Sequence, residues 1–327
     1  MIDLSQMPVL VTGAGGYIGS ALVKAIAAAG PGRIILLDSS EHNLFQIHCY
    51  LEDLPHEAIL GSVTDANLLH RVIGRFSPRI VYHAAALKHV PLLELNPLAA
   101  VRNNAMGTYT LARAAIQHGV PAMVLVSTDK AVNPHSIMGA SKRIAELTVA
   151  ALSGPECRMN AVRLGNVIGS TGSVVPIFRE QISKGGPVTV THPEASRYFM
   201  SLHAAVKAIL AGGAAECGGR ILLPDLGEPE NIADLARLLI EESGRDIPIR
   251  FIGLRPGEKL TEDLVGETEI REGSVIRTPS PAPAELHGLM AQIGCLLAGG
   301  DLAGLIETIC AAVPEYQPSS VIRSACG

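Results

Sequence analysis

The chain lacks tryptophan, and only 3% of its residues are aromatic. Proteins that bind single-stranded nucleic acids stack bases on aromatic side chains, and most nucleic-acid-binding surfaces are basic. This chain carries 26 lysines and arginines against 31 aspartates and glutamates, which gives a net charge of −5. We therefore expect no nucleic-acid partner.

Paired cysteines and long apolar runs are also missing. The six cysteines show no CxxC spacing, which favours free thiols over a disulfide framework or a metal cluster. No apolar run reaches the roughly 20 residues of a membrane span, and no basic segment precedes an apolar one at the start of the chain. These absences predict a soluble, cytoplasmic protein with no metal site and no membrane span.

Short apolar stretches alternate with helical ones through the first half of the chain. We expect strands at residues 9–12, 33–37, 58–60, 80–83, 123–126 and 161–164. We expect helices at residues 20–29, 41–51, 65–75, 97–118 and 137–152. This alternation predicts an α/β fold, a Rossmann-type doubly wound parallel sheet with helices on both faces.

A glycine-rich loop joins the first expected strand to the first helix. Gly13, Gly16 and Gly19 permit a tight turn and let the backbone approach a pyrophosphate, whose charge a helix N-terminus favours. Asp38 closes the second strand, where a carboxylate accepts ribose hydroxyls and repels a 2′-phosphate. The pattern predicts NAD rather than NADP as cofactor. The candidate contacts here are Gly13, Gly16, Tyr17, Ile18, Gly19, Asp38 and Ser39.

The GxxGxxG spacing resembles the extended short-chain dehydrogenase/reductase superfamily. That resemblance implies cofactor contacts by Ser62 and Val63, where the superfamily carries Asp followed by Val or Ile, and by Ala84 and Ala85 after the fourth strand. Asn104 falls where the superfamily has a structural asparagine, and we group it with the substrate-side candidates.

The composition of the chain changes after residue 165, where glycines and prolines interrupt shorter helices and strands. We expect residues 1–167 to form the NAD-binding domain, to which part of residues 195–225 returns. Residues 168–327 should then form a smaller, mainly substrate-binding C-terminal portion, with closing helices around residues 283–297 and 301–313.

Residues 127–142 hold the catalytic candidates. The superfamily places a tyrosine four residues before a lysine on one helix face, and here Met138 precedes Lys142 at that spacing. A thioether cannot carry a proton, so the acid–base groups must lie elsewhere. Thr128, Asp129 and Lys130 follow the fifth strand directly and offer a hydroxyl, an acid and an amine. From the residues alone, an Asp129–Lys130 surface ion pair is an equal alternative.

Residues 127–134 and 138–142 resemble the CapD-like polysaccharide-biosynthesis proteins, which include UDP-N-acetylglucosamine 4,6-dehydratases and a large-type branch with methionine in place of tyrosine. Further matches at residues 84–91, 162–167, 197–200 and 255–260 extend the resemblance over almost the whole chain. Large-type members carry an N-terminal membrane region, and we expect this chain to correspond to their soluble part.

The resemblance implies an internal redox cycle on a UDP-linked hexose. Hydride leaves C4 for NAD, water is lost across C5 and C6, and the hydride returns to C6. Asp129 would be the acid and Lys130 the base, with the pKa of Lys130 depressed by burial or by Lys142. Thr128 would contact the C4 hydroxyl, Lys142 the ribose, and Met138 would pack beside the sugar and nicotinamide.

Candidate substrate contacts lie in the matched loops, where arginine suits a pyrophosphate by bidentate pairing. They are Lys88, Asn104, Asn166, Arg197, Arg255 and Glu258. A UDP-hexose 4-epimerase is the enzymatic alternative, and a catalytically silent NAD-binding sensor is the other. We also expect a homo-oligomer, a dimer or larger.

Overall fold

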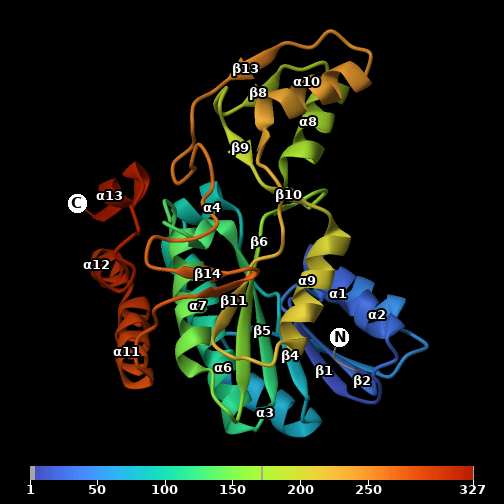
Figure 1. Ribbon diagram of the computed structural model, residues 1–327, viewed down its shortest axis with the longest axis vertical. Coiled ribbons are helices and arrows are strands. Elements are labelled where there is room, and N and C mark those ends of the chain that lie inside the picture. Colours follow the sequence, from blue (N-terminus) through green and yellow to red (C-terminus); the bar gives the residue numbers. More distant parts are fainter. Residues whose placement is uncertain (1–3, 171, 327) are drawn as a thin grey trace.

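The computed structural model describes residues 4–170 and 172–326. A sheet of nine strands lies at the centre, in the order β14-β15-β11-β6-β5-β4-β1-β2-β3 (Figure 1). The strands are β1 (Pro8–Thr12), β2 (Arg33–Asp38), β3 (His56–Leu60), β4 (Ile80–His83), β5 (Ala122–Thr128), β6 (Arg158–Leu164), β11 (Arg220–Leu222), β14 (Ile270–Glu272) and β15 (Val275–Arg277). Strands β1 to β6 and β11 run parallel to one another. Strand β15 runs antiparallel to both of its neighbours, β11 and β14.

The strand order reverses between β4 and β1, and the carboxyl edge at such a switch point is where open α/β sheets bind ligands. β1 and β4 are buried apolar strands between two layers of helices. The predicted fold class, a Rossmann-type sheet, is confirmed. The edge hairpin of β14 and β15 was not expected, because its three-residue strands carry no run of apolar residues.

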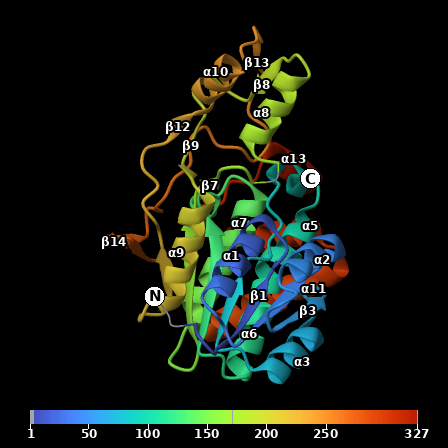
Figure 2. The ribbon, with the colours of Figure 1, turned by 90° about the vertical axis from the view of Figure 1, so that its right-hand side faces the viewer.

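Helices cover both faces of the sheet (Figures 1 and 2). One layer holds α9, which packs on β5 and β6, together with α1 and α2. The opposite layer holds α3, α6 and α7, each packed against the next. The bounds are α1 (Tyr17–Ala28), α2 (Glu41–Tyr50), α3 (Ala66–Phe76), α6 (Gly107–Gln117), α7 (Ile137–Leu152) and α9 (Leu202–Ala214).

The helix expected at residues 97–118 is continuous but not uniform. It consists of α5 (Pro97–Ala100), a π-helical segment η1 (Val101–Met106) and α6. Pro97 begins the helix, where its missing N–H costs nothing. The π-helical segment contains Asn104, whose role is described below. Such segments are frequent at functional sites and cannot be read from hydrophobic spacing.

A small lobe stands above the carboxyl edge of the sheet (Figure 1). It comprises α8 (Val174–Ser183), β8 (Val188–Val190), α10 (Ile232–Glu242) and β13 (Ile249–Phe251). Phe178, Val188 and Ala236 lie in its own apolar core. Two-residue strands pair at its base, namely β7 (Asn166–Val167) with β10 (Phe199–Met200) and β9 (Ser196–Arg197) with β12 (Glu230–Asn231). We had expected only loops and short elements where α8 lies.

Chain from beyond residue 167 also returns to the sheet. α9 and β11 fall within the expected range 195–225, but β14 and β15 add a second return. The division at residue 167 stays a prediction.

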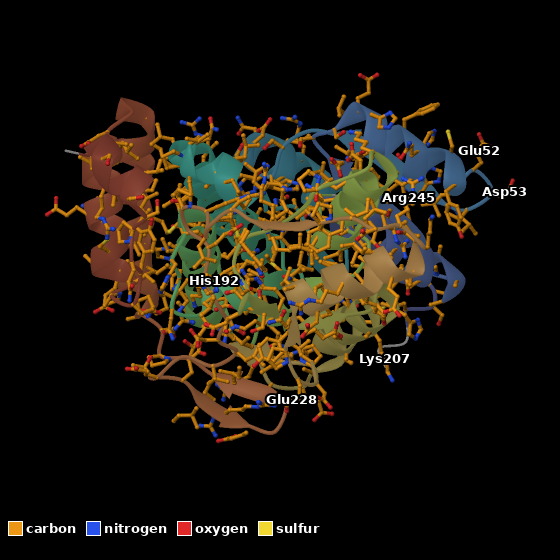
Figure 3. The ribbon with its side chains drawn as sticks, turned by 90° about the horizontal axis from the view of Figure 1, so that it is seen from above. Glu52, Asp53, His192, Lys207, Glu228 and Arg245 are labelled. Carbon is orange, nitrogen blue, oxygen red and sulfur yellow. The ribbon has the colours of Figure 1, made fainter. Side chains whose placement is uncertain are left out.

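Three helices at the end of the chain pack outside α7, on the side opposite α1 and α2 (Figure 3). They are α11 (Pro283–Gly299), α12 (Leu302–Ala312) and α13 (Ser320–Cys326), and with α4 (Val90–Glu94) and α7 they enclose a second core. The segment between α12 and α13 reaches back to the start of α7. Gln317 N donates to the Pro134 carbonyl at 2.9 Å, and Ser319 donates to the Glu94 carboxylate, which also accepts from Ile137 N at 2.8 Å.

A buried ion network fastens the edge hairpin to the core. Arg163 on β6 is fully buried and donates to Glu146 at 2.7 Å and to Glu269 at 2.9 Å. Arg143 on α7 adds a 2.8 Å bond to Glu269. Burial alone would raise the pKa of Glu269, but these guanidinium groups lower it to about 2.

The structure also shows the state of the cysteines and the character of the helices. All six cysteines are unpaired, as their spacing predicted. Across residues 4–170 and 172–326, no helix combines the length and apolar character that crossing a bilayer requires.

Candidate active site

The chain turns sharply where β5 leaves the sheet. Thr128 ends the strand, a 3-10 turn η2 (Asp129–Ala131) follows, and α7 begins after Ser136, whose hydroxyl accepts from Gly139 N at 3.1 Å. A Cβ on Gly139 would lie 2.2 Å from the Lys130 carbonyl oxygen, so only glycine lets α7 start this close to the turn. The turn thereby presents Thr128 and Lys130 directly above α7.

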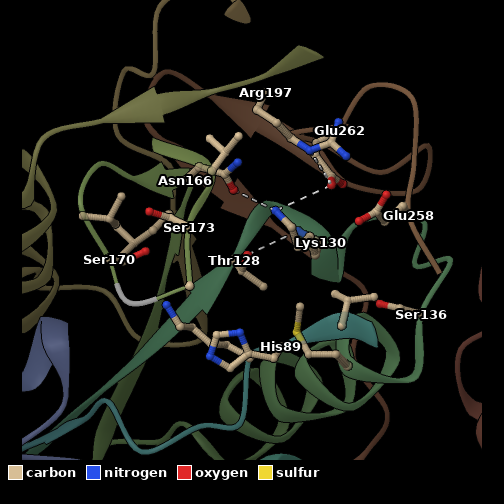
Figure 4. Close-up of a pocket in the computed structure, with 18 of the residues that line it drawn as sticks. His89, Thr128, Lys130, Ser136, Asn166, Ser170, Ser173, Arg197, Glu258 and Glu262 are labelled. Carbon is tan, nitrogen blue, oxygen red and sulfur yellow. Dashed lines mark hydrogen bonds and ion pairs between the residues drawn. The ribbon is translucent and has the colours of Figure 1, made fainter. Parts of the chain in front are cut away.

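A pocket of about 710 Å³ lies between this turn, the glycine loop and the small lobe. Figure 4 shows side chains from β5, the small lobe and the loop after β13 converging on it. The predicted site residues that line it are Gly16, Tyr17, Ile18, Gly19, Ala84, Lys88, Thr128, Lys130, Met138, Lys142, Asn166, Arg197, Arg255 and Glu258. Within the described chain, the remaining candidates are not part of this lining: Gly13, Asp38, Ser39, Ser62, Val63, Ala85, Asn104 and Asp129.

Lys130 is the centre of the polar contacts in the pocket. Its ammonium Nζ lies 3.0 Å from Asp129 Oδ1, 2.9 Å from Asn166 Oδ1 and 3.5 Å from Glu262 Oε1 (Figure 4). Burial lowers the pKa of Lys130, but the carboxylates of Asp129 and Glu262 outweigh burial and raise it above the ordinary value of lysine. The expectation of a depressed pKa is therefore wrong for this arrangement, because Asp129 and, to a smaller extent, Glu262 favour the ammonium more than burial disfavours it.

Asp129 lies beneath the pocket rather than in it. The residue has no exposed surface, and its Oδ1 accepts from the Thr128 hydroxyl at 2.9 Å as well as from Lys130. Among the described residues its Oδ2 finds no hydrogen-bond partner. A buried carboxylate oxygen without a partner costs stability, and such groups concentrate where a site needs them for chemistry. The alternative of a solvated surface pair is excluded.

Lys142 and Met138 lie one helical turn apart on α7, both buried and both lining the pocket. Lys142 Nζ donates to the Val126 carbonyl at 2.8 Å. Burial lowers the pKa of Lys142 to about 8, against a smaller opposing effect of Glu146. The lysine is therefore held at the strand end, independent of any tyrosine.

The glycine loop is as compact as its spacing predicts. A Cβ on Gly13 would lie 2.6 Å from Ala85 N, and one on Gly19 would lie 1.9 Å from the Gly13 carbonyl oxygen. Gly13 also has a φ of +67°, which favours glycine. Tyr17, at the start of α1, donates its hydroxyl to the Ile168 carbonyl at 2.8 Å and so ties this loop to the chain entering the small lobe.

Asp38 is oriented by the backbone around it. Its two carboxylate oxygens accept from Gly15 N and Ser40 N, each at 2.9 Å. The neighbouring Ser39 is exposed. After β3, the hydroxyl of Ser62 bonds Thr64 at 2.9 Å, whereas Val63 is buried. Asp38 and the glycine loop thus share one edge of the sheet, as predicted, with Ser62 at the end of the adjoining strand.

Two of the substrate-side candidates have other partners. Arg197 gives its guanidinium to the carbonyl oxygens of Ser196, Lys259 and Leu260, at 2.7, 2.8 and 3.0 Å. It lines the pocket, but most of its donors already hold the loop after β13. The Arg197 guanidinium is therefore not free to bind a pyrophosphate with two parallel hydrogen bonds.

Asn104 is fully buried behind the pocket. Its amide clamps the backbone of Leu87 with two bonds of 2.9 Å and donates to Ser141 at 3.1 Å. These contacts correct its placement among the substrate-side candidates, since they position the segment after β4 instead. The side chains of Arg255 and Glu258 remain exposed or half-buried at the pocket rim, and burial lowers the pKa of Lys88 beside them.

Sequence reasoning missed Glu262, which is buried in the pocket wall. Besides Lys130 it faces Arg197 Nε at 3.7 Å, and no atom of the described residues hydrogen-bonds its Oε2. It follows the matched segment 255–260 by two residues, so the only available signal was that proximity. Residues 4–170 and 172–326 contain no group of three or more His, Cys, Asp or Glu placed to hold a metal ion.

Residues 9–278 match the family described as polysaccharide biosynthesis protein. The chain is 45% identical over 283 residues to the capsular polysaccharide biosynthesis protein CapD of Staphylococcus aureus, which covers 84% of this chain and 47% of the relative. The chain thus spans about half the length of that relative.

Other relatives carry names of two enzyme activities. A UDP-N-acetylglucosamine 4,6-dehydratase (inverting) of Campylobacter jejuni is 33% identical over 267 residues, covering 80% of this chain and 78% of the relative. A UDP-glucose 4-epimerase of Rickettsia rickettsii is 32% identical over 280 residues, covering 82% and 80%. The solved structure of Pen from Bacillus thuringiensis matches with a TM-score of 0.80 at 29% identity, over 86% of this chain and 90% of that one. The fold, the site and these matches together show that the chain belongs to the polysaccharide biosynthesis family of extended short-chain dehydrogenases/reductases.

Proposed function

We propose that the chain is an NAD-dependent UDP-N-acetylglucosamine 4,6-dehydratase that forms a UDP-4-keto-6-deoxy sugar. The observation that carries the proposal is the Lys130 ammonium held by Asp129 and Glu262 at the end of β5, in one pocket with Lys142 and the glycine loop. Loss of water across C5 and C6 needs an acid and a base beside the sugar. An enzyme that only oxidises and reduces C4 moves the C4 hydroxyl proton alone and needs no acid or base for C5 and C6.

The residues at the sheet edge fit NAD. The N–H groups of Gly13 and Gly15 are already bonded to Leu37 and Asp38, so the proposal assigns the pyrophosphate to the start of α1, which lines the pocket. In this proposal Asp38, fixed by Gly15 N, accepts ribose hydroxyls, and Lys142 contacts the nicotinamide ribose. When bound, NAD supplies oxidation at C4 and reduction at C6.

The chain's own residues would then move the protons. A C4 hydroxyl that donates to Thr128 Oγ1 passes its proton on to Asp129, because Thr128 already donates to Asp129 Oδ1 at 2.9 Å. Asp129 has no exposed surface, so it returns that proton through the Thr128 hydroxyl to the departing C6 hydroxyl, and water leaves. Lys130, as a neutral amine, takes the C5 proton and later returns it. The C4 and C5 protons of the sugar are thus both moved without a tyrosine at position 138.

Arg255 and Glu258 in the loop after β13, with Asn166 at the base of the small lobe and Lys88 after β4, would hold the UDP part of the substrate. All four line the pocket. Arg255 is the arginine whose guanidinium remains available at the rim, so we assign the pyrophosphate to it rather than to Arg197. A homo-oligomer remains our expectation, to be measured by light scattering after size-exclusion chromatography.

The deciding experiment is incubation with NAD and UDP-N-acetylglucosamine, followed by mass spectrometry of the sugar nucleotide. Loss of one water supports the dehydratase. A changed sugar configuration at unchanged mass indicates the epimerase, whose name one relative carries. No change in the sugar, with NAD bound, indicates the silent sensor.

Lys130→Met provides the matching variant, because methionine keeps the aliphatic stem and removes the ammonium. We expect it to lose the dehydration while NAD binding, measured by fluorescence titration, stays within about twofold. Exposed Lys207 on α9, changed to Met, is the control. Dehydration by folded Lys130→Met at the wild-type rate would show that the base is assigned wrongly.

A further inference from the structure

One proton of the proposed reaction, the resting proton of the Lys130 ammonium, has no acceptor so far. In the resting site Lys130 is an ammonium ion, hydrogen-bonded to Asp129 Oδ1 and Asn166 Oδ1. As the base at C5, Lys130 must first lose that proton. Asp129 cannot take it, because Asp129 is needed for the C4 proton that Thr128 relays.

Glu262 is placed to solve this. An ammonium has three donors, and two of those on Lys130 face Asp129 and Asn166. Glu262 Oε1 lies 3.5 Å from Nζ, and Figure 4 shows Glu262 and Asn166 on different sides of Lys130. Asn166 is an amide and cannot accept a proton to form a stable acid, so Glu262 is the second carboxylate that the ammonium faces.

The surroundings of Glu262 leave one of its oxygens open. Glu262 is only 5% exposed, and in the described part of the chain its Oε2 is without a hydrogen-bond donor. Arg197 Nε lies 3.7 Å from Oε1, the oxygen that also faces Lys130. The carboxylate therefore touches the Lys130 ammonium with one oxygen and keeps a free acceptor on the other.

We infer that Glu262 is a positioning residue that acts through Lys130, accepting its resting proton before the C5 step and giving it back at the end of the cycle. This inference rests on the proposed function. In the transfer an N–H bond of Lys130 breaks and an O–H bond forms on Glu262, so an ion pair becomes a neutral amine and a neutral acid. Lys130 then takes the C5 proton, returns it to C5, and recovers its own from Glu262.

The groups that face this pair come from several elements. Asp129 and Glu262 act on Lys130 from η2 and from the loop after β13, and Arg197 acts on both residues from β9. His135, in the turn before α7, is close enough to Glu262 for the carboxylate to act on its charge. Asp129, Arg197 and His135 remain in a Glu262→Gln variant, so its pH dependence reports the loss of a single carboxylate.

Glu262→Gln is nearly isosteric but cannot accept the proton. At neutral pH we expect water loss and solvent-deuterium incorporation at C5 to fall by about 100-fold or more, the usual contribution of a proton-transfer group. C4 oxidation, followed by the absorbance of reduced nicotinamide, should persist. Removing the Glu262 carboxylate, which raises the pKa of Lys130, lowers that pKa, so raising the pH should restore activity as bulk solvent takes the proton.

Exposed Glu267, in the same loop segment, provides the control as Glu267→Gln, with the same loss of charge away from Lys130. If Glu262→Gln does not fold by circular dichroism, Glu262→Asp is measured instead. Its carboxylate is one methylene further away, so we expect a smaller loss and the same rescue at high pH.

The outcomes separate the two proposals. If the wild type removes no water from the sugar, the proposed function fails. If the wild type is active and the folded variant keeps the wild-type rate and pH profile, Glu262 has no part and the inference alone is overturned. Equal loss of C4 oxidation and water loss, without rescue at high pH, would show a structural role and overturn it too.

Discussion

Replacing Lys142 by methionine should make the protein without cofactor more stable. Lys142 is 4% exposed, and burial brings its pKa from 10.5 to about 8. At about 1.36 kcal/mol per pH unit, this gap means that the folded state holds the ammonium at a cost of about 3 kcal/mol. Methionine fills similar space, but losing the bond to the Val126 carbonyl returns about 1 kcal/mol. We expect a net gain of about 2 kcal/mol at pH 7.

The sign of the pH dependence follows from protonation in the two states. Below pH 8 Lys142 is protonated both folded and unfolded, so the wild type bears the full cost. Between about pH 8 and 10.5 the folded protein releases the proton while the unfolded chain keeps it, and wild-type stability rises with pH. The advantage of Lys142→Met should therefore shrink to near zero by about pH 10.

Urea unfolding followed by far-ultraviolet circular dichroism suits the measurement, because the chain has no tryptophan. Lys207→Met is the matched control, at an exposed position on α9 that lies at the periphery in Figure 3. It should change stability by less than about 0.5 kcal/mol at either pH. A Lys142→Met protein that is less stable than the wild type at pH 7, or whose advantage is the same at pH 10, would refute the reasoning. The same variant should bind NAD more weakly.

Two other substitutions test the glycine loop and the ion network. Gly19→Ala places a Cβ 1.9 Å from the Gly13 carbonyl oxygen, so we expect a loss of about 1–3 kcal/mol in urea unfolding and loss of NAD binding by fluorescence titration. Gly288→Ala on α11 has open space around it and should be neutral or slightly stabilising; similar effects at both sites would contradict the packing argument. Arg163→Met leaves the buried carboxylates of Glu146 and Glu269 to share Arg143, so one buried negative charge loses its compensation, and the change should cost about 3–5 kcal/mol in the free energy of unfolding. Arg237→Met removes an exposed pair and should cost at most about 1 kcal/mol, so an equal loss at position 163 would show that the network is no tighter than a surface pair.

What the sequence predicted well was local in origin. Around Gly13 to Gly19, the strand, the glycine loop and the helix follow one another directly in the chain, so neighbouring residues determine them. The same holds for the stretch from Thr128 to Lys142. Helix α7 spans Ile137–Leu152, as its spacing predicted.

What the sequence could not supply was long-range. Glu262 contacts Lys130 because the loop after β13 folds back over β5. The residues next to Lys130 or Glu262 in the sequence do not indicate that contact. Arg197 was expected to bind the pyrophosphate, but its guanidinium donates to carbonyl oxygens of the same loop instead. The pKa of Lys130 is raised by Asp129, which lies next to it in the sequence, and further by Glu262, whose contribution only the fold reveals.

The segment that carries Gln317 and Ser319 gives the site a place in the timing of folding. A chain emerges from the ribosome N-terminal end first, and domains tend to fold as units. Strands β1 to β6 and the glycine loop precede residues 317 and 319 in the chain and can pair before these are made. The Pro134 carbonyl then gains Gln317 N, and the Glu94 carboxylate, already bonded to Ile137 N, gains Ser319 as a second partner. The segment that leads into α7 is thus completed later in synthesis than the parallel sheet it follows.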